Sequence, residues 1–174
     1  MKMKTTALFL FFALSFICGF AQEKSKKQIK EEQKIEKRKL IESLVNAKTF
    51  VFVASTALPQ GYKSITLTSA SYQVKYSPDT IVSYLPYYGK AYSGAGYGGD
   101  TGLKFEGKAD DYSVATEKKN YTISAKVKGS NDTYQLYLTV GFEGSATLSV
   151  NSNNRSSISY RGEIVPAKSQ EEKK

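Results

Sequence analysis

The strongest constraint on the fold is an alternation of apolar and polar residues that begins at Phe50 and runs through most of the chain. The stretches NYTISAKVK (120–128), TYQLYLTVGF (133–142) and SATLSVNS (145–152) place apolar residues at every second position. Successive side chains of a β-strand point to opposite faces, whereas a helix repeats about every 3.6 residues. This part of the chain is therefore predicted to form strands that each have one apolar and one polar face.

Clusters of turn-forming residues separate these strands and earlier segments of the same kind. Examples are SPD (77–79), EG (143–144) and NSNN (151–154). The spacing predicts about nine short strands between residues 50 and 166, many of them joined by hairpin-sized loops. An antiparallel sheet with one polar face has to curl over its apolar face or cover it. We predict a single, mainly β domain over residues 49–166, built as one antiparallel, strongly curved sheet or a flattened sandwich with one N-terminal helix.

Residues 1–21 have the pattern of a secretory signal peptide. Two lysines precede a nearly unbroken apolar run (7–21), and Gly19 and Ala21 are the small residues expected beside the cut. The run is shorter than the about 17–25 residues that a membrane span needs. We expect cleavage near Ala21, export to the periplasm or cell envelope, and a mature chain that does not span a membrane.

Cys18 is the only cysteine, and a cysteine at the end of such a run can be the lipidated residue of a lipoprotein. Ile17 is bulky at the position where a lipoprotein peptidase favours a small residue, so cleavage near Ala21 is favoured over lipidation at Cys18. After that cleavage the mature chain has no cysteine. No disulfide could then stabilise the fold, which would depend on its hydrophobic core.

The segment 22–48 is rich in Lys, Glu and Gln and contains no Gly or Pro, which predicts a charged N-terminal helix. Apolar residues gather on one face only near its end, at Leu40, Ile41, Leu44 and Val45. We expect this end to dock on the sheet domain and the earlier part to be a solvated spacer. The alternative is an arm that binds anionic lipid.

The positive charge of the chain, +9 in total, lies in its flanks. Residues 50–166 contain 11 basic and nine acidic residues, so the domain itself is nearly neutral. The last residues, 167–174, are predicted to form a charged, disordered tail. A nucleic-acid-binding protein would carry its basic residues on the folded face, so we do not expect nucleic acid as a partner.

The composition excludes several kinds of site. The chain has no histidine, and its one cysteine lies in the signal, which removes Ser–His and Cys–His pairs and His/Cys metal sites. We therefore predict no catalytic residue, no metal and no cofactor. A glycosidase would need only two carboxylates, but most of the candidates fall in predicted turns or at strand edges. These candidates are Asp100, Glu106, Asp110, Asp111 and Asp132.

A segment rich in tyrosine and glycine, YLPYYGKAYSGAGYGGDTG (84–102), interrupts the alternation. It contains the spacing G-x-G-x-x-G, but the residues after it alternate like a strand. A dinucleotide-binding loop leads into a helix whose N-terminus meets the pyrophosphate. We therefore interpret the match as incidental.

The tyrosines of this segment combine an apolar ring with a hydroxyl, which suits recognition surfaces. Tyr84 and Tyr87 lie near the end of a predicted strand and are expected to cover the core. For Tyr88, Tyr92 and Tyr97 two interpretations stay open: they cover the core, or they form a mobile lid that stacks on a ligand. A glycan, peptide or lipid of the cell envelope would be the ligand. The candidate ligand-binding residues are Tyr88, Tyr92, Tyr97 and Asp100.

Several stretches of the chain, among them FVFVASTALP, YLPYYGKAYS, YGGDTGLKFEG, NDTYQLYLTV and GSATLSVNSNNRSSISYRGEI, resemble domain-of-unknown-function family 4251. The resemblance covers residues from about Leu40 to Ile164. It implies an exported bacterial protein with a single envelope domain. It implies no activity, and no catalytic residue can be carried over.

Three functions follow from these observations. The leading hypothesis is a non-catalytic envelope domain that binds a ligand or partner through the tyrosine- and glycine-rich segment. The second is a structural or assembly component of the envelope without a ligand pocket. The third and least favoured is a carboxylate-dependent glycan hydrolase.

Overall fold

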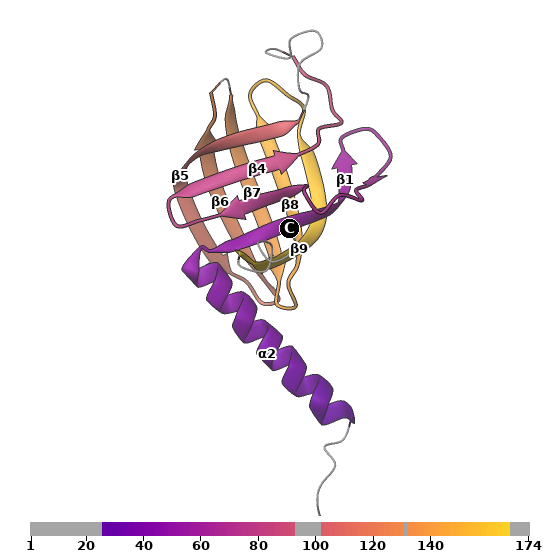
Figure 1. The fold of residues 1–174 in the computed structure, drawn as a ribbon, viewed down its shortest axis with the longest axis vertical. Coiled ribbons are helices and arrows are strands. Elements are labelled where there is room, and N and C mark those ends of the chain that lie inside the picture. The colour runs from indigo at the N-terminus through magenta and orange to yellow at the C-terminus, as the bar shows by residue number, and fades with distance from the viewer. Residues whose placement is uncertain (1–25, 93–101, 131, 168–174) are drawn as a thin grey trace, which may run out of the picture. The chain divides into compact units, whose positions relative to one another are not determined.

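The computed structural model describes residues 26–92, 102–130 and 132–167. These residues form one helix followed by nine strands (Figure 1). The elements are α2 (Lys26–Ala47), β1 (Phe50–Pro59), β2 (Ile65–Thr66), β3 (Gln73–Tyr76), β4 (Thr80–Leu85), β5 (Leu103–Thr116), β6 (Asn120–Lys128), β7 (Thr133–Gly141), β8 (Ser145–Ser152) and β9 (Ile158–Pro166).

The sheet is a closed antiparallel barrel of eight strands. From β3 to β9 each strand pairs with the next one in the sequence, and β1 joins the two ends because it pairs with both β3 and β9. The short strand β2 pairs only with the far end of β1. The prediction of a mainly β, antiparallel domain is confirmed. The prediction of an open curved sheet or a flattened sandwich is wrong, because hydrogen bonding continues from β9 to β1 and leaves no gap in the wall.

The alternation in the sequence explains the interior. On β6 the apolar residues Tyr121, Ile123, Ala125 and Val127 are all buried, and the polar residues between them face outward. Strands β7 and β8 likewise bury every second residue, and aliphatic and aromatic side chains form the core of the barrel. Each fully buried aliphatic side chain contributes about 1.5–3 kcal/mol of transfer free energy.

Two strands turn the corners of the barrel. In Figure 1 the strands β4 and β1 run across the front of the molecule, and β6 to β9 run steeply behind them. Each corner strand carries a bulge, between Ala54 and Thr56 in β1 and between Asp110 and Ser113 in β5. A bulge bends a strand and increases its twist, which allows one strand to pair with strands at the front of the barrel and with strands at its back.

Gly162 permits the closure at the β1 corner. A Cβ atom built on Gly162 would overlap the carbonyl oxygen of Val53 on the neighbouring strand. The two backbones approach each other more closely than any residue with a side chain would allow. The bulge in β1 lies directly opposite this glycine, so the bend and the missing side chain act together.

The last turns of α2 close one end of the barrel. Contacts divide the chain into the units 1–34 and 35–174, and the docking residues Ile41 and Val45 belong to the second unit. The helix ends at Ala47. The next residue, Lys48, adopts a left-handed conformation (φ 52°), and the amide of Thr49 donates to the carbonyl of Leu44. This is a Schellman-type end, with lysine in the position that glycine usually occupies.

In the first unit, the described residues 26–34 are helical and exposed throughout. The residues of α2 thus lie within the segment predicted to be helical, and the burial of Ile41 and Val45 agrees with the predicted docking face. No helix in the described part of the chain combines the length and the hydropathy that crossing a bilayer requires.

Candidate functional site

The end of the barrel opposite α2 is closed by a hydrogen-bonded tyrosine. Tyr87 follows β4 and is buried, and its hydroxyl lies 2.9 Å from the carbonyl oxygens of both Lys90 and Ser156, which share its one proton. The hydroxyl of Ser156 lies 2.9 Å from the same tyrosine oxygen and accepts a hydrogen bond from the amide of Lys90 at 3.0 Å. These contacts fix the first residues of the tyrosine- and glycine-rich segment against the loop between β8 and β9.

The segment then pairs with that loop as a short antiparallel ladder. Ala91 forms a β-bridge with Arg155. The amide of Ser156 donates to the carbonyl of Lys90 at 2.9 Å, and the amide of Tyr92 donates to the carbonyl of Asn154 at 2.8 Å. The backbone is therefore held in place as far as Tyr92.

The loop between β8 and β9 also contacts Gly102, the first described residue after segment 93–101. The guanidinium of Arg155 donates to the carbonyl of Gly102 at 3.0 Å, and it lies 5.2 Å from the centre of the Tyr87 ring. Asn154 and Arg155 therefore fix the chain both before and after the central part of the tyrosine- and glycine-rich segment.

Tyr160, on β9, supports this arrangement from inside the barrel. Its ring is fully buried, and its hydroxyl donates to the carbonyl of Pro86 at 2.7 Å. Burial, and secondarily the nearby Tyr87 and Tyr88, raises the pKa of Tyr160 above its usual value. The neutral hydroxyl is therefore retained as a hydrogen-bond donor at ordinary pH.

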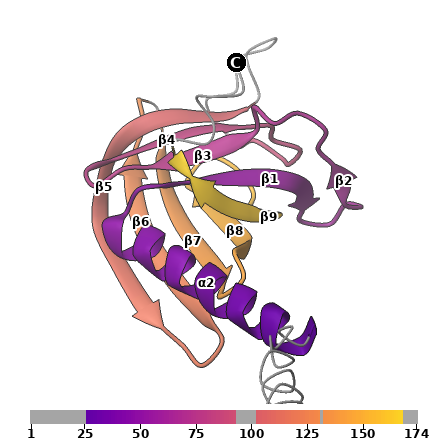
Figure 2. The same cartoon turned by 60° about the horizontal axis from the view of Figure 1, so that its bottom comes forward.

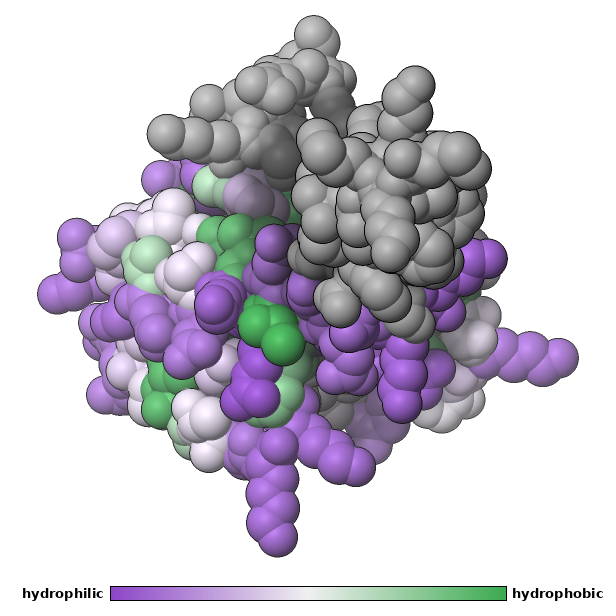
Figure 3. Space-filling model, turned by 90° about the horizontal axis from the view of Figure 1, so that it is seen from below, coloured by the Kyte–Doolittle hydropathy of each residue, from purple (hydrophilic) through white to green (hydrophobic). Residues whose placement is uncertain are grey.

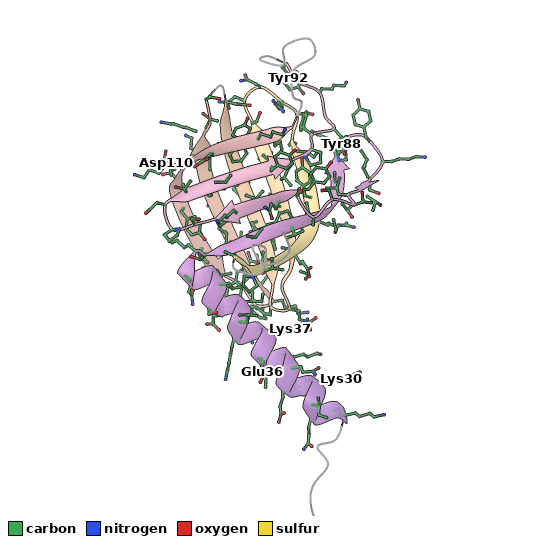
Figure 4. All side chains as sticks on the ribbon, in the orientation of Figure 1. Lys30, Glu36, Lys37, Tyr88, Tyr92 and Asp110 are labelled. Atoms are coloured by element: carbon green, nitrogen blue, oxygen red, sulfur yellow. The ribbon has the colours of Figure 1, made fainter. Side chains whose placement is uncertain are left out.

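The structure describes some of the predicted site residues and not others. Tyr88 and Tyr92 are exposed, with 38% and 70% of their surface accessible, and Figure 4 shows both at the end of the barrel away from α2. Tyr97 and Asp100 lie outside the described residues. Tyr87 covers the core, as predicted.

The prediction that Tyr84 covers the core is wrong. In β4 the inward positions belong to Ile81, Ser83 and Leu85, so Tyr84 faces outward and is 44% exposed. Its ring lies near-parallel to that of Tyr72 with 6.3 Å between the centres, and the Nζ atom of Lys104 is 4.6 Å from its centre. The alternation of inward and outward residues, counted from the apolar Ile81, puts Tyr84 on the outward face, so the sequence did contain the signal for its position.

Sequence reasoning missed the residues that hold the site together. Arg155 and Ser156 directly follow the predicted turn 151–154, and Ser156 lies 69 residues beyond Tyr87, which both residues contact. No local pattern predicts this pairing, because it depends on which loops meet at one end of the barrel.

Among the candidate carboxylates, Asp132 has a local structural role. Asp132 accepts hydrogen bonds from the amides of Thr133 and Asn153 and, at 2.6 Å, from the hydroxyl of Ser152, which joins two turns. Asp110 pairs with Lys126 just before the bulge of β5, Asp111 lies in that bulge, and Figure 4 shows Asp110 on the other side of the barrel from Tyr88. Within the described residues no group of three His, Cys, Asp or Glu side chains could hold a metal ion.

Two hollows lie on the outer wall, away from the tyrosines. One of about 490 Å³ and one of about 420 Å³ share the lining residues Ser55, Ser145 and Gly162. Their linings are largely hydroxyl-bearing or charged side chains. Seen from below in Figure 3, the coloured surface is also mostly hydrophilic, with small and separate hydrophobic patches.

Comparison with known proteins gives one family and one fold. A family model for a domain of unknown function, DUF4251, matches residues 32–164. The crystal structure of a DUF4251 family protein from Bacteroides eggerthii DSM 20697 superposes with a TM-score of 0.59, at 20% identity over 75% of this chain and 88% of that chain. No curated protein matches this chain. Since the family model covers most of its length, the chain belongs to the DUF4251 family.

Proposed function

We propose that this protein is a non-catalytic domain of the cell envelope that binds a ligand or partner through the exposed tyrosines beyond β4. The signal pattern of residues 1–21 supports the location. The observation that carries the binding role is the anchoring of Tyr92 and Gly102 by Asn154 and Arg155. It holds the backbone beside Tyr88 and Tyr92 while their side chains stay accessible.

This arrangement lowers the entropic cost of binding. An exposed side chain on a free loop loses both backbone and rotamer freedom when a ligand orders it. Here the backbone up to Tyr92 is already fixed by hydrogen bonds to Asn154 and Ser156. Tyrosine itself has few rotatable bonds and a large contact area, so most of its contact energy is retained as affinity.

The filled interior supports recognition on the outside of the barrel. The side chains that face inward are buried aliphatic and aromatic groups, and Leu136, Leu138 and Leu148 are at most 1% exposed. The proposed surface is therefore the rim with Tyr88 and Tyr92, extended along β4 by Tyr84 with its neighbours Tyr72 and Lys104. Rings next to a cation favour ligands that combine an apolar face with hydroxyl or anionic groups.

A binding screen tests this proposal. The purified protein would be offered envelope polysaccharides, peptidoglycan, peptides and lipid vesicles. Any hit would be measured again with the double variant Tyr88→Ala/Tyr92→Ala. We expect at least a tenfold loss of affinity, which is the effect of removing about 1.4 kcal/mol of contact energy. The matched control is Tyr137→Ala, because Tyr137 is 45% exposed on β7, outside the proposed surface.

The second candidate function is an envelope structural component without a ligand pocket. The buried core favours it, since the inward-facing side chains of the described strands pack together in the barrel. A screen without any hit, or a hit that Tyr137→Ala weakens as much as the double variant does, would support this alternative and contradict the binding proposal.

A further inference from the structure

The second half of β5 has a strand on only one side. β4 pairs with β5 from Leu103 to Lys108, and β6 pairs with it from Ala109 to Thr116. Within the described residues, no strand pairs with the other edge of β5 after Lys108. Figure 2 shows this half of β5 extending along the outside of the barrel with β6 as its neighbouring strand.

The hairpin geometry shows which backbone groups face the open edge. The amide of Glu117 donates to the carbonyl of Asn120 at 2.8 Å, so Glu117 is a hydrogen-bonded position of the β5–β6 ladder. Such positions alternate along an antiparallel pair, so Ala115 faces β6 and Val114 and Thr116 face away from it. None of the backbone hydrogen bonds of the described loops and turns involves Val114 or Thr116.

The side chains of this edge do not protect it. Residues 113–116 (SVAT) are all exposed, and Val114 is 39% exposed. Edge strands usually carry a charge, a proline or a bulge that prevents pairing with another chain. Here the bulge lies before the exposed residues, where Asp111 adopts a left-handed conformation (φ 53°). The edge is therefore a short, uncharged strand with free donors and acceptors.

The charges at the two ends of this strand have opposite sign. Asp110 and Asp111 precede the uncharged stretch 112–116, and Glu117, Lys118 and Lys119 follow it, which leaves a net positive charge at the hairpin turn. In an antiparallel pair of two such strands, the residues that face the edge lie opposite each other. With Val114 opposite Thr116 of the second copy, Asp111 lies opposite Lys119. The acidic end of each copy thus meets the basic end of the other, and like charges directly opposite each other would have been unfavourable.

We propose that two copies of this chain pair through the free edge of β5 in an antiparallel, two-fold symmetric arrangement. The free edge of β2 is a poorer candidate, because β2 has only the residues Ile65 and Thr66. Pairing through β5 leaves the tyrosines at the other end of the barrel accessible in both copies. This inference is independent of the proposed binding function, since none of its residues belongs to the tyrosine surface.

Sedimentation velocity over a range of concentrations tests the proposal. The wild-type protein is expected to form a concentration-dependent dimer. Val114→Pro removes an amide that faces the edge but no hydrogen bond to β6, so it should weaken the dimer at least about tenfold, a change of about 1.4 kcal/mol. Val114→Ala keeps the amide and is the matched control, expected to stay within about threefold of the wild type.

The charge pattern is tested with Lys118→Glu/Lys119→Glu. This double variant should weaken the dimer more at low salt than at high salt, because salt screens the charges. Circular dichroism and thermal unfolding would show that each variant monomer is folded. A wild-type protein that stays monomeric at all concentrations would overturn the proposal. So would a dimer that Val114→Pro leaves unchanged while the variant remains folded.

Discussion

The two ends of the barrel are closed by different physical means. At the helix end, Ile41 and Val45 of α2 pack on the core, and the ring of Tyr76 stacks on that of Phe50 with 4.6 Å between the centres. The hydroxyl of Tyr76 is buried there without a hydrogen-bond partner. At the tyrosine end, the hydroxyls of Tyr87 and Tyr160 both donate to backbone carbonyls.

This difference separates stability from recognition. The helix end buries apolar surface, and the buried hydroxyl of Tyr76 has no hydrogen-bond partner, so the side chains there stabilise the fold mainly through packing. The tyrosine end uses hydrogen bonds that position a backbone, and it leaves Tyr88 and Tyr92 exposed. Only the second kind of closure presents side chains in a fixed arrangement to a partner.

The largest expected effect comes from a charge at the helix end. Ile41→Asp places an unpaired carboxylate in the core, which should lower the free energy of unfolding by about 4 kcal/mol. Leu40→Asp is the control, since Leu40 is 47% exposed on the same helix, and it should change stability by less than about 0.5 kcal/mol. Urea titrations measure both. Equal effects of the two variants would mean that the helix does not close the barrel.

Alkaline pH should destabilise both ends. Burial raises the pKa of Tyr76 and of Tyr160 above the usual value and raises the pKa of Tyr112 to about 12. Unfolded tyrosines ionise near pH 10, so above that pH the unfolded state binds fewer protons and stability falls. This contribution to stability is fully present below pH 10. Above pH 10, each fully buried tyrosine lowers the free energy of unfolding by about 1.4 kcal/mol per pH unit.

Urea titrations between pH 9 and 11.5, with phenolate absorbance followed in parallel, test this expectation. Tyr76→Phe should reduce the pH dependence. If all the tyrosines titrate near pH 10 in the folded protein, the buried hydroxyls are not protected as the structure indicates.

At neutral pH a pair of matched variants compares the two hydroxyls directly. Tyr160→Phe leaves the carbonyl of Pro86 without its donor and should cost about 1–2 kcal/mol. Tyr76→Phe removes a buried hydroxyl that has no partner, so it should be neutral or slightly stabilising. Thermal and urea unfolding measure both. A substantial loss of stability in Tyr76→Phe would show that its hydroxyl does have a partner.

The smallest effect is expected at the exposed tyrosines. Tyr88→Ala/Tyr92→Ala should lower stability by about 1 kcal/mol or less, because neither side chain is part of the buried core. Tyr87→Ala removes a buried ring whose hydroxyl has three hydrogen-bonding contacts, so it should lower the free energy of unfolding by about 3 kcal/mol. Thermal unfolding of the two variants gives the comparison. A loss in the double variant as large as in Tyr87→Ala would place Tyr88 and Tyr92 in the core and contradict their proposed function.

Much of the fold could be predicted from local pattern. The alternation in 120–128 and 133–142 correctly assigned strands β6 and β7 and the side chains that they bury. The apolar residues at the end of the charged segment correctly marked Ile41 and Val45 as the docking residues. Each of these features depends on neighbours in sequence, which is why a period was enough to find it.

The candidate site was only partly predictable. The tyrosine-rich composition pointed to Tyr88 and Tyr92, but it assigned Tyr84 to the core and could not identify Arg155 or Ser156. Hydrogen bonds between loops that are far apart in the chain follow from where the strands end in space. Composition carries no information about that position.

The sequence by itself determined the strands, the faces that they bury and the helix, because side-chain periodicity and turn chemistry are local properties. Only the tertiary structure decided that the sheet closes, since closure requires the bulge of β1 to meet Gly162 on β9. The same closure pairs the loop of Arg155 with the tyrosine segment, and the second half of β5 has a strand on one side only. Both proposed contact surfaces thus arise from long-range backbone pairing, which no single stretch of the sequence encodes.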